Sequence, residues 1–231
     1  MEKIGISKIV EFIRLKDGPR QTFINNLKKP KPPKKIKTEE SSDGGDYWST
    51  SIWAISNAYK NNKPILIKDK IADLFERHGK ATAKTSKDMY LQNIQILHNV
   101  EDYDLKVFKP QFDLQYLSKP KEKSIFKIKD IPVQVLPQYV FTFKENDISK
   151  IGAIWFIAKI KGYSIEEIGL FADALYRYLN LNYSKDFEIN SNYCVAFDVS
   201  SLQEVRYSTV ENNSIVTLLD SVMDILKPFL K

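Results

Sequence analysis

The sequence predicts a helix-rich α+β protein with a basic extension at its N-terminus. Apolar residues recur at helical spacing in several segments and alternate as in strands in others, in the order helices, strands, a helical hairpin, strands and a helix. The chain has 231 residues and a hydrophobic content of 43%, which is enough for one sizeable core. We therefore expect a basic arm, a helical subregion, short strands, a central helical hairpin and a C-terminal helix.

The net charge of +6 is concentrated at one end of the chain. The first 37 residues hold eleven lysines or arginines and three acids, which gives them +8 and leaves −2 for the other 194 residues. A near-neutral body with a cationic extension differs from a protein that is basic throughout. The positive charge therefore predicts a contact made by the N-terminal segment rather than by the whole body.

The N-terminal arm, residues 1–27, is expected to form short helices. Ile9, Phe12 and Ile13 share one face of a helix over residues 7–16, and a second apolar turn follows it. Helices this short are marginal alone in water. They therefore need to pack on the main body, on another copy of the chain or on a different protein.

Residues 28–45 are predicted to be a linker. Its first part reads KKPKPPKKIK, where prolines disfavour a helix or a central strand and lysines keep the chain solvated. The simplest interpretation is a solvated spacer. A second interpretation is a polybasic contact with nucleic-acid phosphates, and a third is a contact with an acidic protein or an anionic surface. The candidate nucleic-acid-binding or partner-binding residues are Lys28, Lys29, Lys31, Lys34, Lys35 and Lys37.

The main body is expected to be a single α+β domain over residues 46–231, with a helical part at 46–100 and a mixed part at 124–231. Three helices in the first part would also allow a helix-turn-helix arrangement. The second of them lacks the basic face that reading DNA requires. The predicted helices cover residues 47–59, 67–78 and 87–100.

The mixed part begins after an irregular stretch at 101–125. From Ser124 onward the hydrophobic period shortens, which predicts two or three short strands broken by Pro132 and Pro137. Towards the C-terminus, strands are predicted at 193–199 and 204–209. An amphipathic helix at 214–229 closes the chain, and its apolar stripe fits either the core or a dimer seam.

The central hairpin, residues 147–183, is the most apolar segment. Its second half is a helix with a capping box, because Ser164 and Glu167 have the required spacing. Its first half is an apolar run around Trp155 that fits a buried strand or a buried helix. We favour a helix, because Asp147 suits its start and Gly162 suits the residue after its last turn.

Catalytic patterns are missing from the sequence. It contains no P-loop, no G-x-G-x-x-G and no G-x-S-x-G motif. Cys194 lies in an apolar context typical of a buried, inert thiol. Together with His78 and His98 it falls short of the four ligands of a structural zinc site. We therefore predict no catalytic residue, no metal and no cofactor.

Carboxylates leave one enzymatic alternative open. Asp198 and Glu204 fall on two predicted neighbouring strands that could bring them together, and acid pairs of this kind bind Mg²⁺ in nucleases. The densest acidic group in the sequence is Glu101, Asp102 and Asp104.

The prediction for function is a non-enzymatic bacterial accessory protein that acts within an assembly. The bacterial origin is inferred from the richness in Lys, Ile and Asn. A protein partner is expected, nucleic acid is a second partner through the arm, and the oligomeric state is left open. No segment predicts a membrane span or a secretory signal, so a cytoplasmic location is expected. The alternatives are a helix-turn-helix DNA-binding regulator and a metal-dependent nuclease.

Overall fold

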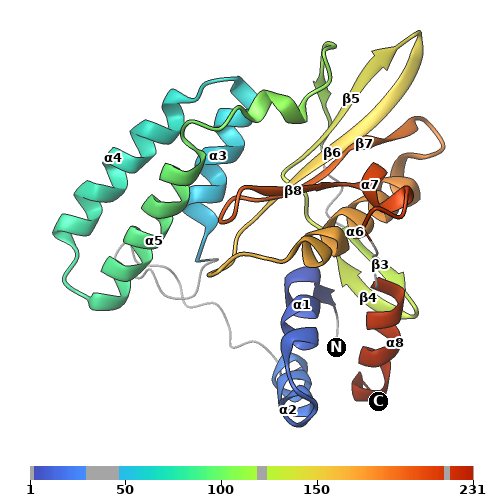
Figure 1. Cartoon of the computed structure of the whole chain (residues 1–231), viewed down its shortest axis with the longest axis horizontal. Helices are drawn as coiled ribbons and strands as arrows, with labels where there is room; N and C mark the ends of the chain where they lie inside the picture. Colours follow the sequence, from blue (N-terminus) through green and yellow to red (C-terminus); the bar gives the residue numbers. More distant parts are fainter. Residues whose placement is uncertain (1–2, 30–46, 119–123, 216–218, 231) are drawn as a thin grey trace.

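The computed structural model describes residues 3–29, 47–118, 124–215 and 219–230. It confirms the α+β class: a mixed five-stranded sheet carries helices on both of its faces, and a smaller three-stranded sheet lies beside it (Figure 1). In the described residues, no helix is long and apolar enough to cross a membrane.

The large sheet has the strand order β2-β5-β6-β7-β8. Only β6 and β7 run parallel, and helix α6 (Ile165–Tyr183) connects them, as a parallel crossover requires. The other neighbouring strands are antiparallel. The strands are β2 (Gln115–Tyr116), β5 (Tyr139–Glu145), β6 (Ile148–Ile157), β7 (Glu188–Asp198) and β8 (Gln203–Arg206).

Two hydrophobic cores form, one on each face of this sheet. Alternate residues of a strand point to opposite faces, so Cys194 and Ala196 of β7 join one core while Val195 and Phe197 join the other. All four side chains are buried. A strand buried on both faces reads as a continuous apolar run.

The helix predicted for the first half of the hairpin is wrong, because residues 148–157 form strand β6. Asn146 and Asp147 both have positive φ angles and make a two-residue turn from β5 into β6. Asp147 therefore belongs to a hairpin turn rather than to a helix cap. Gly162, with φ of 68°, lies in the loop that leads from β6 to α6.

The second half of the hairpin is confirmed as α6. The Ser164 hydroxyl accepts from the Glu167 backbone N–H at 3.4 Å, and the Glu167 carboxylate accepts from the Ser164 N–H at 2.9 Å. This reciprocal pair satisfies two donors that the first turn of a helix leaves unpaired.

The three helices predicted within residues 47–100 form, and they cover one face of the sheet. The buried amide of Asn93 on the third helix ties it to the first, since its Oδ1 accepts from the Ser51 N–H at 3.2 Å and its Nδ2 donates to the Tyr47 carbonyl at 3.0 Å. A short 3₁₀ helix, η1 (Leu105–Phe108), leads back to the sheet. The three helices are α3 (Ser49–Asn61), α4 (Ile65–Lys80) and α5 (Lys84–Val100).

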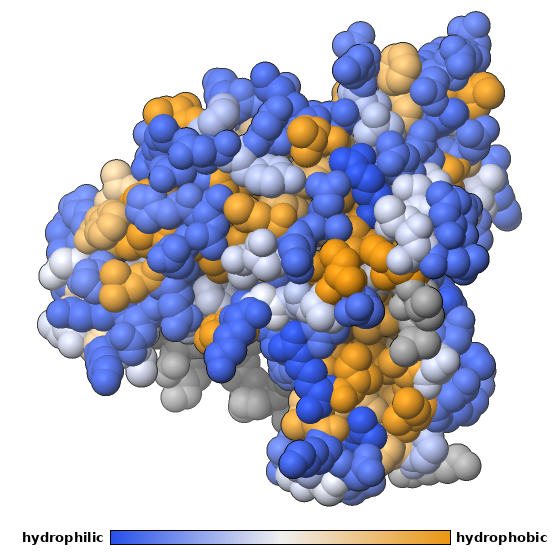
Figure 2. Space-filling model, viewed as in Figure 1, coloured by the Kyte–Doolittle hydropathy of each residue, from blue (hydrophilic) through white to orange (hydrophobic). Residues whose placement is uncertain are grey.

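The opposite face carries α6, the two N-terminal helices and the C-terminal helix. The predicted strand at 204–209 ends early, because Tyr207–Glu211 form helix α7. Figure 2 shows an apolar strip between α1 and α8. Ile13 of α1 and Phe229 of α8 are partly buried against the core on this side of the sheet. The remaining elements are α1 (Ile6–Arg14), α2 (Asp17–Lys28), α8 (Leu219–Leu230), β1 (Ile4–Gly5), β3 (Ile125–Ile128) and β4 (Ile131–Gln134).

The N-terminal helices pack on the main body rather than standing apart from it. Ile9, Val10 and Phe12 are completely buried in the same core as α6. The Arg14 guanidinium forms a salt bridge with Glu167 and donates to the Gly162 carbonyl at 3.1 Å. Of the three packing partners left open for these short helices, residues 3–29 contact the main body. The predicted linker lies mostly outside the described residues.

Candidate functional site

A groove runs between helix α3 and the short edge strand β2. It consists of two adjoining hollows, of about 1190 Å³ and about 600 Å³, which share Lys60 and Tyr116 in their walls. Trp53, Asn57 and Lys60 line the smaller hollow from α3. They share one face of the helix, because residues four and seven apart recur on the same side. We call this feature the α3 groove.

Lys60 divides the α3 groove. Its ammonium lies 5.5 Å from the ring centroid of Tyr116 and 5.6 Å from that of Tyr139, which are cation–π distances. In the described part of the chain it contacts these rings rather than a carboxylate. Its charge is therefore available to an anion that enters the groove.

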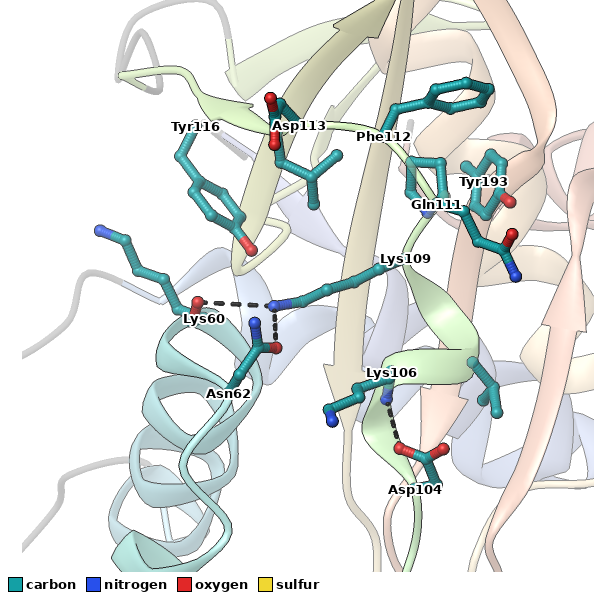
Figure 3. Close-up of a pocket in the computed structure, with 13 residues that line it drawn as sticks. Lys60, Asn62, Asp104, Lys106, Lys109, Gln111, Phe112, Asp113, Tyr116 and Tyr193 are labelled. Atoms are coloured by element: carbon teal, nitrogen blue, oxygen red, sulfur yellow. Dashed lines mark hydrogen bonds between the residues drawn. The ribbon is translucent and has the colours of Figure 1, made fainter. Parts of the chain in front are cut away.

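Lys109 closes the end of α3. Its ammonium donates to the Tyr59 carbonyl at 2.5 Å. It also donates to the Asn62 side-chain oxygen at 2.7 Å and to the Lys60 carbonyl at 3.4 Å (Figure 3). A lysine at a helix C-terminus satisfies carbonyls that lack a partner within the helix. The pKa of Lys109 is lowered to about 8, mainly by burial and to a smaller extent by repulsion from Lys106. Lys109 thus holds the η1 segment against α3.

Three tyrosine rings form the wall between α3 and the sheet. Tyr139 stacks on Tyr59 with 6.0 Å between centroids and meets Tyr116 edge to face at 5.2 Å. Burial raises the pKa of Tyr116 to about 12 and that of Tyr59 further, so both hydroxyls stay protonated.

The hydroxyls of Tyr59 and Tyr116 are buried without a hydrogen-bond partner among the described residues. Tyr59 as a whole is only 1% exposed. In Figure 3 the Tyr116 side chain points into the space between Lys60 and Lys109. Buried polar groups are nearly always paired, so a water or a ligand is expected beside these hydroxyls.

Each hollow of the α3 groove holds one exposed aromatic ring. Trp53 is 63% exposed in the smaller hollow, with the Lys70 ammonium 5.6 Å from its ring centroid. Phe112 is 43% exposed in the larger hollow and stacks nearly parallel on Phe143, 5.9 Å away. Each ring therefore has area left to receive another planar group.

The larger hollow also contains two acids. Asp104 accepts from the Lys106 backbone N–H at 3.0 Å and so caps η1, whereas Asp113 is exposed. With Lys60, Lys106 and Lys109 opposite two carboxylates, the lining has a small excess of positive charge. The arrangement fits an anionic ligand that also carries planar rings.

The predicted lysine site is only partly described. The Lys28 ammonium donates to the Phe229 carbonyl at 3.4 Å, and that of Lys29 to the Asn26 side chain at 2.9 Å. Lys31, Lys34, Lys35 and Lys37 lie outside the described residues. Helix α2 lies well away from α3 in Figure 1, so Lys28 and Lys29 are not part of the α3 groove.

The carboxylates proposed for a nuclease are not brought together. Glu204 lies opposite Phe197 in the β7–β8 ladder, so Asp198 points to the other face of the sheet. Asp198 is buried and accepts from the N–H groups of Tyr163 and Ser200, at 2.8 and 2.9 Å. Its role in the structure is to join two loops.

The other candidate residues are held in ion pairs or are buried. Glu204 accepts from Arg206 at 2.8 Å, and the His98 ring contacts Glu101 at 2.9 Å. Cys194 is fully buried, and burial raises its pKa, which keeps the thiol protonated. Within the parts of the chain that the structure covers, no three His, Cys, Asp or Glu side chains converge as metal ligands.

Helix α4 does not present an unpaired row of basic side chains. Asp73 pairs with both Lys70 and Arg77, and Glu76 pairs with Lys80. Helices α4 and α5 lie side by side, and the surface over them in Figure 2 is mainly hydrophilic with isolated apolar residues. The geometry gives no support to a DNA-reading helix here.

Sequence reasoning missed the α3 groove. Its lysines and aromatic residues come from α3, from the stretch predicted to be irregular at 101–125, and from strands β5 and β7. A local signal did exist, since Lys106 and Lys109 precede Phe112 and Tyr116 at short intervals. No model of a known protein family, no curated protein and no solved structure matches this chain.

Proposed function

We propose that this protein is a non-enzymatic accessory component of an assembly and that it contacts nucleic acid. The observation that carries the proposal is the α3 groove, where Lys60 lies over the partly buried Tyr116 ring and each hollow also holds one exposed ring, Trp53 or Phe112. Proteins that bind nucleic acid without reading its sequence combine these two features. The lysine-rich segment at 28–37 adds support as a second source of positive charge.

The physical basis is the release of counterions. Each phosphate that a lysine neutralises frees condensed cations, so affinity falls steeply as salt rises. Lysine supplies charge with little preference for one base over another. The proposed binding is therefore strong at low salt and tolerant of sequence.

The experiment measures the affinity for a labelled oligonucleotide at several salt concentrations. We expect a smaller salt slope when glutamine replaces Lys28, Lys29, Lys31, Lys34, Lys35 and Lys37, because fewer counterions are released. The control variant replaces six lysines that are exposed elsewhere in the described chain, Lys68, Lys84, Lys127, Lys144, Lys161 and Lys185, and so removes the same charge.

A control variant that loses as much salt dependence as the first would show that only net charge matters. A wild-type protein without measurable affinity at low salt would reject the proposed function. The helix-turn-helix and nuclease alternatives rest on no comparable feature of the described residues.

A further inference from the structure

We propose that the α3 groove binds a single strand of nucleic acid, with bases stacked on Trp53 and Phe112 and phosphates held by Lys60 and Lys106. This inference rests on the proposed function and adds to it the location of the site and the form of the ligand.

The aromatic residues select for a single strand. A protein ring can stack only on a base whose face is free, and in a duplex the base faces are covered by their neighbours. Trp53 and Phe112 are the exposed rings in the two hollows, and each is held in place by a contact on the protein side. Isolated exposed aromatics are common, but here two of them lie in one groove with lysines between them.

The size of the α3 groove also suits a short single strand. Trp53 and Lys60 are two helical turns apart, which is ~10 Å along α3. Stacked nucleotides rise by about 3.4 Å each, so this distance spans about three of them. The hollow at Trp53, of about 600 Å³, has the size of a ligand pocket, and the hollow at Phe112, of about 1190 Å³, is somewhat larger.

The wall shared by the two hollows provides the polar contacts. The Lys60 ammonium lies over the Tyr116 ring and is held there by cation–π contacts rather than by an ion pair in the described chain. The Tyr116 hydroxyl beneath is buried and has no partner among the residues described. A phosphate or base oxygen that enters between Lys60 and Lys109 would pair with the Lys60 ammonium and with the Tyr116 hydroxyl.

Lys106 extends the positive charge into the larger hollow. Its backbone N–H is bound by Asp104, which fixes the start of η1, while its side chain lines the hollow. The larger hollow therefore offers a second cation, Lys106, as well as the exposed ring of Phe112.

The experiment compares single-stranded DNA and RNA with duplex DNA of the same length, using Trp53→Ala, Phe112→Ala and Lys60→Gln. We expect each aromatic variant to bind single strands about tenfold more weakly, because each loses the stacking of one base. Affinity for the duplex should be nearly unchanged. The matched controls are Phe75→Ala and Lys68→Gln, which remove an exposed aromatic and an exposed lysine from α4.

Thermal unfolding of each variant verifies that the fold is kept, as expected for exposed side chains. Equal losses of single-strand affinity in Trp53→Ala and Phe75→Ala would overturn the inference. A wild-type protein that binds duplex DNA more tightly than single strands would also overturn it. Salt-dependent binding that no groove variant changes would reject this site and leave the proposed function standing. No binding to any of the three probes would reject both.

Discussion

At the scale of single residues, Lys109 shows how burial and charge set the shape of the α3 groove. Its three hydrogen bonds hold the η1 segment to the end of α3, although burial penalises the charged ammonium. Because its folded pKa of about 8 is below the ordinary value of 10.5, the unfolded chain holds this proton more tightly. The contribution of Lys109 to stability therefore rises as the pH increases from about 8 towards 10.5.

We predict that Lys109→Met removes this pH dependence. Denaturant unfolding of the wild type and the variant across that pH range should show their free energies of unfolding diverging in favour of the wild type. Lys63→Met, at an exposed position in the turn after α3, is the control. A difference between wild type and Lys109→Met that stays constant with pH would contradict the lowered pKa.

Asp198 is a second residue whose role follows from its partners. It accepts from two backbone N–H groups and from the Ser201 hydroxyl at 2.9 Å, and all three donors belong to loops at the ends of β6 and β7. We predict that Asp198→Ala lowers the free energy of unfolding by about 2–4 kcal/mol, because buried donors lose their acceptor. Asp198→Asn retains one acceptor oxygen and should cost less.

Urea unfolding of both Asp198 variants provides the measurement. An unfolding free energy that does not change in Asp198→Ala would contradict the structural role. It would favour a functional role for the carboxylate instead.

At the scale of elements, the β6–α6 unit shows what the sequence could and could not predict. The capping box at Ser164 depends on neighbours in sequence, and the helix was predicted from it correctly. The apolar run before it is ambiguous by composition, because burial on both faces removes the alternation typical of a strand. The pair Asn146-Asp147 was the missed signal, since both residues tolerate the positive φ of a hairpin turn.

We predict that Ser164→Ala costs about 1 kcal/mol of stability through the loss of this cap. Ser221→Ala, at an exposed position inside α8, should change the free energy of unfolding by less than about 0.5 kcal/mol. Equal effects of the two substitutions on thermal unfolding would show that the cap contributes nothing beyond helix propensity.

At the scale of the whole molecule, the sheet separates two cores, and the N-terminal helices complete one of them. Sequence patterns identified α1 and its apolar face but not its location, because packing partners far apart in the chain leave no local pattern. The α3 groove was hidden for the same reason, since it forms only when α3, the η1 segment and β5 meet.

We predict that Phe12→Ala destabilises the protein by about 3–5 kcal/mol, as expected for a phenylalanine in a core. Phe171→Ala in α6, on the same side of the sheet, should have an effect of similar size. A cost below about 1 kcal/mol for Phe12→Ala would mean that the N-terminal segment does not belong to the folded body in solution.

The most direct test of nucleic-acid contact at the α3 groove is the salt slope of affinity for a single-stranded oligonucleotide. The account predicts that Lys60→Gln with Lys106→Gln reduces the slope by about 1.4, since each phosphate contact contributes about 0.7 for single strands. The control pair Lys68→Gln with Lys84→Gln should leave it close to the wild-type value. Equal slopes for the two double variants would contradict the account.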